Sequence, residues 1–320
     1  MVGLAEIKAA RENITGFVHR TPLLSSQSIN SATGKNLWFK AECFQKTGSF
    51  KARGASNKIK TLASQKLNGV ITISSGNHGQ ATAYVAGRLG IPAVIMVPDG
   101  TPQPKIDAAR AYGAEVIIGG DLNNVEPLIE KAFTLAVERK LEPIHPFEDP
   151  LIIAGQGTLG LEILDDLPDV DVVTVPVGGG GLLAGVAVAM KQSRPKIKVY
   201  GIGPVNASSM FTSYHSRKME TLHDMPQTIA DGIRTPMVSQ VTLEHALKHV
   251  DDIITVTDDE IVTAMKLAWS RLKVLVEPSG ASSLAAIQAG RVPVPQGAKI
   301  ACVFSGGNVD FKKVAKLLAA

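Results

Sequence analysis

The sequence has few of the features that mark disulfide-rich, membrane or nucleic-acid-binding proteins. Only two cysteines, Cys43 and Cys302, occur in 320 residues. They are too few for a disulfide framework or a four-ligand metal site, and they suit a reducing cytoplasm. No uncharged apolar run approaches the roughly 20 residues of a membrane helix. The net charge is only +4, and no lysine and arginine cluster alternates with aromatic residues, so we expect neither a nucleic-acid nor a membrane partner. Charges at Glu6, Lys8 and Arg11 also argue against a secretory signal.

The sequence does contain an alternation of short apolar runs and longer helical stretches. Runs rich in β-branched residues predict strands at Gly69–Ser74, Ala93–Val97, Glu115–Ile118, Val172–Val177, Lys198–Ile202 and Ile300–Phe304. Helices are expected from His78, over Pro104–Tyr112, over Val125–Arg139, from Leu182, after Lys198–Ile202 and at the C-terminus. Continuously apolar strands separated by helices predict parallel sheets covered on both faces. We therefore expect an α/β fold of two lobes across a cleft, with ligands outside the C-terminal strand ends.

Four glycines, Gly178 to Gly181, separate one predicted strand from the helix that begins at Leu182. Backbone N–H groups at such a junction converge on an anion. A dinucleotide fingerprint can be forced here, but the next strand ends Tyr200-Gly201-Ile202-Gly203 without the acidic residue that would bind ribose, and no Walker-type loop exists. We expect a phosphate that is not part of a nucleotide; the alternative is a tight turn for close packing.

Lys51 lies in the segment K-T-G-S-F-K-A-R-G (46–54), directly after Phe50 and among small residues. Desolvation in such a setting disfavours the ammonium form and frees a nucleophilic amine, which Schiff-base chemistry requires. The alternative is an ordinary solvated lysine.

Two further loops place hydroxyl and amide groups at predicted strand ends. The segment S-S-G-N-H-G-Q (74–80) can hold a carboxylate, or its Ser75 or Asn77 can cap a helix, and His78 is equally suited to the protein interior. In S-G-G-N (305–308), Ser305 can present a neutral hydroxyl to a ring nitrogen or cap the last helix.

Together with A-G-Q-G-T (154–158), A-D-G (230–232) and V-E-P (276–278), these segments resemble the serine/threonine dehydratase and serine racemase family. That family uses pyridoxal 5′-phosphate and has the two-lobed tryptophan-synthase-β-like fold, fold type II. Cysteine synthases share the fold, but their asparagine loop has threonine where this chain has His78. The resemblance implies a large cofactor-binding domain, 1–68 and 149–320, and a small substrate-loop domain, 69–148.

The resemblance also implies roles for individual residues. Lys51 would form the Schiff base with the cofactor and then act as the base at the substrate Cα. The implied cofactor-binding residues are Phe50, Lys51, Asn77, Gly178, Gly179, Gly180, Gly181, Leu182, Glu277 and Ser305. The implied substrate-binding residues are Ser74, Ser75, Asn77 and His78. Glu277 would orient a hydrogen-bond network near the cofactor, or form a salt bridge at a helix start. Because the neutral Ser305 hydroxyl does not force the ring nitrogen to protonate, the ring is a weaker electron sink, which favours β-elimination of water.

By this resemblance, we expect an ammonia-lyase that converts L-serine or L-threonine into a 2-oxo acid and ammonia. The alternatives are an amino-acid racemase, or a dehydratase of 3-hydroxyaspartate or a bulkier β-hydroxy amino acid. Ser75 supports the racemase, because plain threonine dehydratases usually carry alanine there and a hydroxyl opposite Lys51 could reprotonate the carbanion. Leu128 argues against it, since mammalian-type serine racemases place an arginine there. An alternative of another class is a non-catalytic protein that binds a phosphate ligand between two lobes.

The family's divalent-metal site is expected to be absent or weak. Its pattern has Glu and Asp six residues apart, where this chain has Gly203 and Ser209 with Ala207 between; Mg²⁺ and Ca²⁺ depend on carboxylate oxygens. The chain ends twelve residues after Asn308, so we expect no regulatory domain and no feedback by isoleucine. Because many relatives are dimers, a cytoplasmic homodimer is expected.

Overall fold

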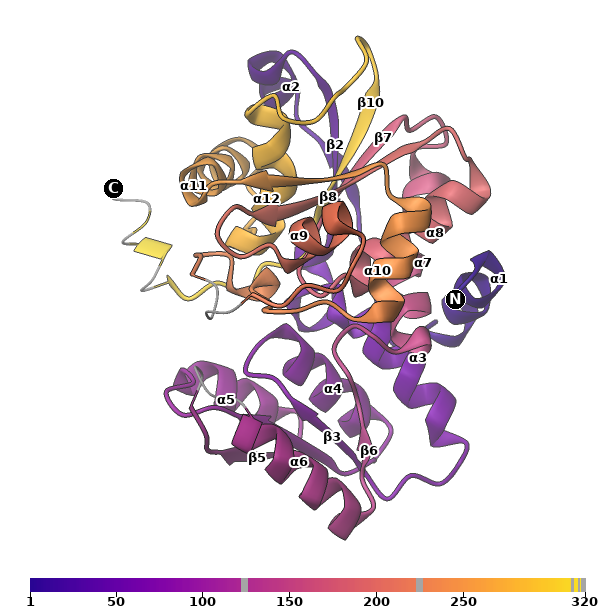
Figure 1. The fold of residues 1–320 in the computed structure, drawn as a ribbon, viewed down its shortest axis with the longest axis vertical. Coiled ribbons are helices and arrows are strands. Elements are labelled where there is room, and N and C mark those ends of the chain that lie inside the picture. The colour runs from indigo at the N-terminus through magenta and orange to yellow at the C-terminus, as the bar shows by residue number, and fades with distance from the viewer. Residues whose placement is uncertain (122–125, 223–226, 312–313, 316, 318–320) are drawn as a thin grey trace.

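The chain folds around two separate sheets in a computed structural model that describes residues 1–121, 126–222, 227–311, 314, 315 and 317 (Figure 1). The larger sheet has the strand order β1 (Leu23–Ser25), β2 (Asn36–Ala41), β10 (Lys299–Phe304), β7 (Val172–Pro176), β8 (Lys198–Pro204) and β9 (Asp252–Val256). Its neighbours pair in parallel except β1, which runs antiparallel to β2. The smaller sheet is wholly parallel and has the order β5 (Glu115–Ile118), β4 (Ala93–Val97), β3 (Val70–Ile73) and β6 (Glu142–Pro143).

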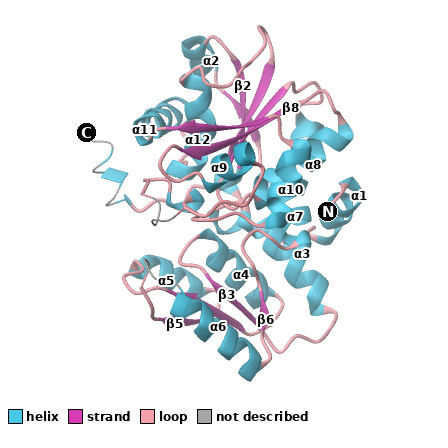
Figure 2. Cartoon of the chain, viewed as in Figure 1, coloured by secondary structure: helices cyan, strands magenta, loops and turns pink. Residues whose placement is uncertain are grey.

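Helices cover both sheets (Figure 2). On one face of the larger sheet lie α7 (Pro150–Asp166), α8 (Gly181–Ser193) and α10 (Gln240–His249); on the other lie α11 (Asp258–Leu267) and α12 (Pro278–Gln288). The smaller sheet packs against α3 (Lys51–Ala63), α4 (Asn77–Arg88) and α5 (Gln103–Ala111) on one face and α6 (Glu126–Arg139) on the other. The remaining helices are α1 (Leu4–Asn13), α2 (Gln27–Thr33), α9 (Ser209–Ser216), the 3₁₀ turns η1 (Glu42–Phe44), η2 (Lys46–Gly48) and η3 (Asp231–Ile233), and the π-helical turn η4 (Ala268–Leu272).

The predicted α/β fold of parallel sheets flanked by helices is confirmed. The six predicted strands correspond to β3, β4, β5, β7, β8 and β10, each continuously or nearly continuously apolar. No apolar run in the sequence predicted β1, β2, β6 or β9. In β2 the apolar pattern is interrupted by Lys40, whose buried amine is satisfied by partners far away in the sequence. The expected C-terminal helix falls on residues that lie largely outside the described part of the chain.

The helix α3 connects the two sheets, because it packs against α4 beside the smaller sheet and against α7 beside the larger one. It lies between the sheets in Figure 1. Its first residue is Lys51. The lysine predicted to react is thus placed where the two sheet units meet.

Both cysteines are free thiols, with Cys302 buried and Cys43 partly buried. Burial raises the pKa of each thiol to about 12. Neither is therefore a thiolate nucleophile near neutral pH. Among the residues that the structure describes, no helix combines the length and apolar character needed to cross a bilayer.

Candidate active site

The turn that leads into Lys51 has an unusual backbone. Thr47 and Gly48 both have positive φ angles, +61° and +71°. Glycine adopts this conformation at no steric cost, whereas a β-branched threonine adopts it only where the surroundings impose it. A Cβ on Gly48 would also overlap the side chain of Asn308. The turn therefore depends on contacts with its neighbours.

Those neighbours are the residues of Ser305–Asn308, the turn that follows β10. The backbone N–H of Phe50 donates a hydrogen bond to the carbonyl of Ser305 at 3.0 Å. Asn308 Nδ2 donates to the carbonyl of Thr47 at 2.7 Å. Because β10 runs parallel to β2, two segments more than 250 residues apart meet at the same sheet edge. The structure thereby brings the predicted lysine loop and the predicted Ser305 together.

The amine of Lys51 lies in surroundings that favour its uncharged form. Its Nζ donates a hydrogen bond to the carbonyl of Pro146 at 2.8 Å and lies 5.1 Å from the centroid of the Phe50 ring. No carboxylate of the described residues forms an ion pair with it. Burial therefore lowers the pKa of Lys51 to about 8. At neutral pH a useful fraction of this amine is a free nucleophile or base.

The predicted glycine loop, Gly178–Gly181, is packed too tightly for side chains. A Cβ on Gly179 would overlap the ring of Phe147, and a Cβ on Gly181 would lie 2.8 Å from the Phe147 carbonyl oxygen. Gly180 has a φ of +95°, which any other residue would adopt only with strain. Crowding and backbone conformation together explain the glycine run.

This loop also carries free hydrogen-bond donors. Within the described ranges, no residue accepts a hydrogen bond from the backbone N–H groups of Gly179, Gly180 or Gly181. They stand at the start of α8, where the helix dipole favours an anion. Leu182, in the first turn of this helix, is buried beside them. Because Phe147 follows the Pro146 that bonds Lys51, the amine and this donor cluster share one neighbourhood.

Asn77, Glu277 and Asn308 form a hydrogen-bonded triad that connects the smaller sheet unit to the larger one. Asn77 Nδ2 donates to Glu277 Oε1 at 2.9 Å, and the backbone N–H of Asn308 donates to Glu277 Oε2 at 3.2 Å. Asn308 Nδ2 donates to Asn77 Oδ1 at 2.8 Å. Glu277 therefore takes part in a hydrogen-bond network, and it forms no salt bridge with any residue that the structure describes.

The surroundings of Glu277 also raise its affinity for a proton. Burial raises the pKa of the Glu277 carboxyl to about 8, and the nearby carboxylate of Asp231 adds to the increase. The hydrogen bonds from Asn77 and Asn308 act in the opposite direction. A carboxyl that titrates near neutral pH beside the predicted cofactor site is typical of an active site.

The serine-rich loop before α4 places its polar groups in different ways. Ser74 Oγ accepts a hydrogen bond from the N–H of Gly76 at 3.2 Å. The partly buried Ser75 hydroxyl has no partner among the described residues.

His78 is buried, and its Nε2 lies 2.9 Å from the carbonyl of Ile144, so Nε2 carries the donated proton. Burial and the nearby Lys51 amine lower the pKa of His78 to about 3, which keeps the ring neutral. A substrate-binding role for His78 would therefore depend on Nδ1 or its backbone.

Gly203 and Ser209 occupy the two positions where the family's pattern has acidic metal ligands, and both contact neighbouring protein groups. Gly203 lies in β8, where a Cβ would overlap Oγ of Ser208. Ser209 Oγ donates to the carbonyl of Thr235 at 2.9 Å. Among the described residues no group of three His, Cys, Asp or Glu side chains is placed to hold a metal ion.

Some site residues were not predicted from the sequence. The sequence predicts no role for Asn308, although it ends the segment S-G-G-N, and none for Pro146 or Phe147. The signal for Asn308 was its place after two glycines at a strand end. Pro146 contributes only its carbonyl oxygen, which carries no signal in the side-chain sequence.

Comparisons with known proteins agree with this geometry. The model of a family described as pyridoxal-phosphate dependent enzyme matches residues 14–306. Human serine racemase is 42% identical over 315 residues, which span 97% of this chain and 92% of that protein. The L-threonine ammonia-lyase of Thermotoga maritima is 41% identical over 319 residues, 99% of this chain and 78% of the relative. The structure of maize serine racemase superimposes with a TM-score of 0.92 at 39% identity, covering 99% of this chain and 97% of the other.

Proposed function

This chain belongs to the family of pyridoxal-phosphate-dependent enzymes, and from that premise we propose that it eliminates water from small β-hydroxy amino acids. The substrates would be L-serine and L-threonine, and the products a 2-oxo acid and ammonia. The relatives are named for racemase and for ammonia-lyase activity at almost equal identity, so the choice depends on this chain's own residues. One observation supports elimination most directly. The Lys51 amine has a lowered pKa, and the loop that carries it is hydrogen-bonded to Ser305 through the N–H of Phe50.

The residues of the site fit pyridoxal 5′-phosphate. The unpaired N–H groups of Gly179–Gly181, with those of Gly178 and Leu182, would hold the phosphate at the start of α8. Phe50, Asn77 and Glu277 would line the ring, and Ser305 would face its nitrogen. Two buried hydroxyls in the adjoining turn, Thr47 Oγ1 and Ser49 Oγ, have no partner among the described residues, as expected beside a polar ligand. When bound, the cofactor withdraws electrons from the substrate Cα and so acidifies its proton.

The chain's own groups would then move protons and orient the substrate. The Lys51 amine would take the Cα proton, because a pKa of about 8 leaves it able to accept a proton near neutral pH. The backbone and hydroxyl groups of 74–77 at the start of α4 would hold the substrate carboxylate. The β-hydroxyl would leave as water with one proton, which balances the proton taken from the Cα. The enamine that remains would then add water after release and give the 2-oxo acid and ammonia.

The neutral hydroxyl of Ser305 favours elimination over reactions that need a long-lived Cα carbanion. A carboxylate facing the ring nitrogen would keep it protonated and stabilise a long-lived Cα carbanion, whereas a hydroxyl does not. Elimination needs only brief carbanion character, since the β-hydroxyl can leave as the charge forms. Ser305 is buried at the end of β10, so water would not replace it as the partner of the nitrogen.

The second candidate function, amino-acid racemisation, is favoured by one observation. The Ser75 hydroxyl stands at the start of α4 without a partner in the described part of the chain, which leaves it available to donate a proton to the Cα face opposite Lys51. Against it, the position where mammalian-type serine racemases carry an arginine is Leu128, and this side chain is buried with α6 against β3 and β4. We therefore propose racemisation as a side activity at most.

The elimination is tested by measuring 2-oxo acid production from L-serine, L-threonine, D-serine and 3-hydroxyaspartate with the cofactor-loaded enzyme. We expect turnover of the first two and its loss in Lys51→Ala. The matched control is Lys60→Ala on the same helix, which should keep activity. Borohydride reduction should fix a pyridoxyl group on the Lys51 peptide. Normal activity in Lys51→Ala, or no adduct there, would overturn the assignment and revive a non-catalytic phosphate-binding protein.

Ser75→Ala separates the two functions. If Ser75 reprotonates the Cα, the variant at saturating substrate should lose D-serine formation by about tenfold or more while the kcat of elimination stays within about twofold, because one proton transfer is removed. The lost contact with the substrate carboxylate should raise KM for both reactions alike. Ser74→Ala is the matched control for loss of a neighbouring hydroxyl. An equal loss of both reactions in Ser75→Ala would mean that Ser75 only positions the substrate.

We also propose that activity needs no divalent metal, since Gly203 and Ser209 offer no carboxylate. Dialysis against EDTA should leave the rate unchanged, whereas a loss that Mg²⁺ restores would contradict this.

A cytoplasmic homodimer is proposed as well; the free thiols Cys43 and Cys302 are consistent with the cytoplasm. Light scattering of the purified protein should give twice the chain mass, and a monomer mass would overturn it.

A further inference from the structure

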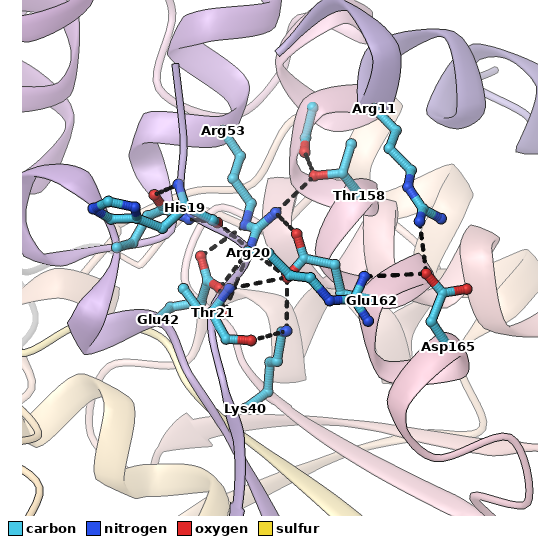
Figure 3. A network of polar contacts seen from close by, with 12 residues as sticks. Arg11, His19, Arg20, Thr21, Lys40, Glu42, Arg53, Thr158, Glu162 and Asp165 are labelled. Carbon is cyan, nitrogen blue, oxygen red and sulfur yellow. Dashed lines mark hydrogen bonds and ion pairs between the residues drawn. The ribbon is translucent and has the colours of Figure 1, made fainter. Parts of the chain in front are cut away.

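Arg53, two residues after Lys51, is the bulkiest fully buried side chain in the described part of the chain. Its guanidinium holds two carboxylates at once (Figure 3). Towards Glu42, Nε and Nη2 each donate a hydrogen bond at 2.8 Å. Towards Glu162, Nη1 donates at 2.7 Å and Nη2 at 2.9 Å. Two bidentate pairs leave the guanidinium one orientation, because its donors lie in a rigid plane.

The network around Arg53 is balanced in charge. Lys40, also fully buried, forms an ion pair with Glu162 at 2.7 Å, so the two buried cations face the buried carboxylates of Glu42 and Glu162. Lys40 also forms a longer ion pair, at 3.8 Å, with the less buried Asp166. Thr158 Oγ1 accepts a further hydrogen bond from Arg53 Nη1 at 3.2 Å. Although burial acts to raise it, the pKa of Glu162 is held below its usual range by Arg53 and Lys40. The Glu162 carboxyl therefore stays ionised at neutral pH, which keeps its bonds to Arg53 and Lys40.

The network closes the base of the segment that carries Lys51. Glu42 and Arg53 bracket residues 43–52, which include the left-handed turn at Thr47 and Gly48. The middle of this segment is held by Asn308, which donates to the carbonyl of Thr47. Side chains two positions apart on a helix point to roughly opposite sides, so Arg53 points away from the site while sharing the first helical turn with Lys51.

We propose that Arg53 is a positioning residue, which joins Glu42 to Glu162 and thereby fixes the 43–52 segment so that the Lys51 amine stays against the carbonyl of Pro146. This inference rests on the proposed function only in taking Lys51 as the reactive amine. Among the described residues no side-chain hydrogen bond joins Arg53 to the amine, so the effect would act through the backbone of the first turn of α3.

Stability alone does not explain the network. Replacing buried ion pairs by apolar residues of similar volume is often neutral or stabilising. We infer that in this chain the fixed geometry of the ion pairs specifies one arrangement of the start of α3. An apolar contact between α3, α7 and η1 would fill the same space but allow the start of α3 to rotate or slide. A rotation there would move the Lys51 amine out of its present surroundings.

The test measures Lys51 in the cofactor-free protein, by the pH dependence of its modification with acetic anhydride and mass spectrometry of its peptide. Wild type should titrate at about 8. In Glu42→Gln and Arg53→Lys we expect the Lys51 midpoint to rise by about one pH unit or more, because a released amine gains contact with water. The affinity for pyridoxal phosphate should fall at least tenfold in both variants. Thr158→Val, which removes one acceptor of Arg53, should shift the midpoint in the same direction by less, and it keeps the test available if Arg53→Lys does not fold.

The matched controls are Ile59→Val and Ile59→Ala. Ile59 is buried on the same helix but lies outside the charged network, so these variants lower stability without breaking the ion pairs of Arg53. At an equal loss of thermal midpoint, Lys51 should still titrate at about 8. An unchanged Lys51 midpoint in Glu42→Gln and Arg53→Lys, or an equal rise in the Ile59 variants, would overturn the proposal. Because this readout needs neither cofactor nor substrate, it stays separate from the test of elimination.

Discussion

Lys51→Met should make the cofactor-free protein more stable near neutral pH, although it removes the reactive amine. Unfolded, this amine has an ordinary pKa of 10.5; folded, burial lowers it to about 8. Below pH 8 the amine is protonated in both states, so the folded state bears the full cost of the buried charge. Between pH 8 and 10.5 the folded amine loses its proton first and that cost disappears.

The magnitude follows from the difference in pKa. A depression from 10.5 to about 8 corresponds to at most about 3 kcal/mol at neutral pH, at roughly 1.4 kcal/mol per pH unit. Lys51 is only partly buried, so solvent reduces this figure, and the lost hydrogen bond to the Pro146 carbonyl offsets about 1 kcal/mol. A net gain of about 1–2 kcal/mol remains, which raises the thermal midpoint of a chain of this size by about 2–3 °C.

The assay is thermal unfolding of the cofactor-free protein at pH 7 and at pH 10. The matched control is Lys60→Met, since Lys60 lies on the same helix and also donates to a backbone carbonyl, that of Asn13. We expect Lys51→Met to be more stable than wild type at pH 7 and no more stable at pH 10, and Lys60→Met to be less stable at both. A Lys51→Met variant that is less stable than wild type at pH 7 would refute the argument that burial of the charge lowers this pKa.

Three further predictions concern the surroundings of the amine. Gly180→Ala should weaken binding of pyridoxal phosphate at least tenfold, because Gly180 has a φ of +95° and a Cβ there would lie 2.5 Å from Met210 Cε; equilibrium dialysis that shows wild-type affinity would contradict this. Asp231→Asn should move the titration of Glu277 below about 8, because a carboxylate that helps to raise that pKa is removed; an upward shift in carboxyl titrations followed by infrared spectroscopy would contradict it. Asn308→Ala should cost about 2 kcal/mol, since it removes two side-chain hydrogen bonds, and a thermal midpoint within 1 °C of wild type would show that the lysine turn does not depend on it.

Elements whose signal is local could be predicted from the sequence. The strand β4, A-V-I-M-V, is buried along its whole length, so an unbroken apolar run was enough to predict it. The glycine loop was predictable for a similar reason, because a helix start after a strand needs no partner to present its N–H groups. In contrast, β2 contains Lys40, and only the distant Glu162 and the Thr21 carbonyl explain why a lysine is buried there.

The missing parts of the site depend on pairings between distant segments. Asn308 meets the lysine turn because β10 pairs with β2, and no local pattern encodes that strand order. Pro146 presents a carbonyl oxygen, which every residue has. Arg53 looks like an ordinary helix residue until its two carboxylate partners, eleven and 109 positions away, are known.

The proposed elimination is tested most directly by a proton NMR time course of the cofactor-loaded enzyme with L-serine in deuterated water. We expect pyruvate to accumulate while the remaining serine keeps its Cα proton, because each deprotonation by Lys51 leads on to loss of the β-hydroxyl. Deuterated D-serine accumulating without pyruvate would contradict it and make racemisation the main reaction.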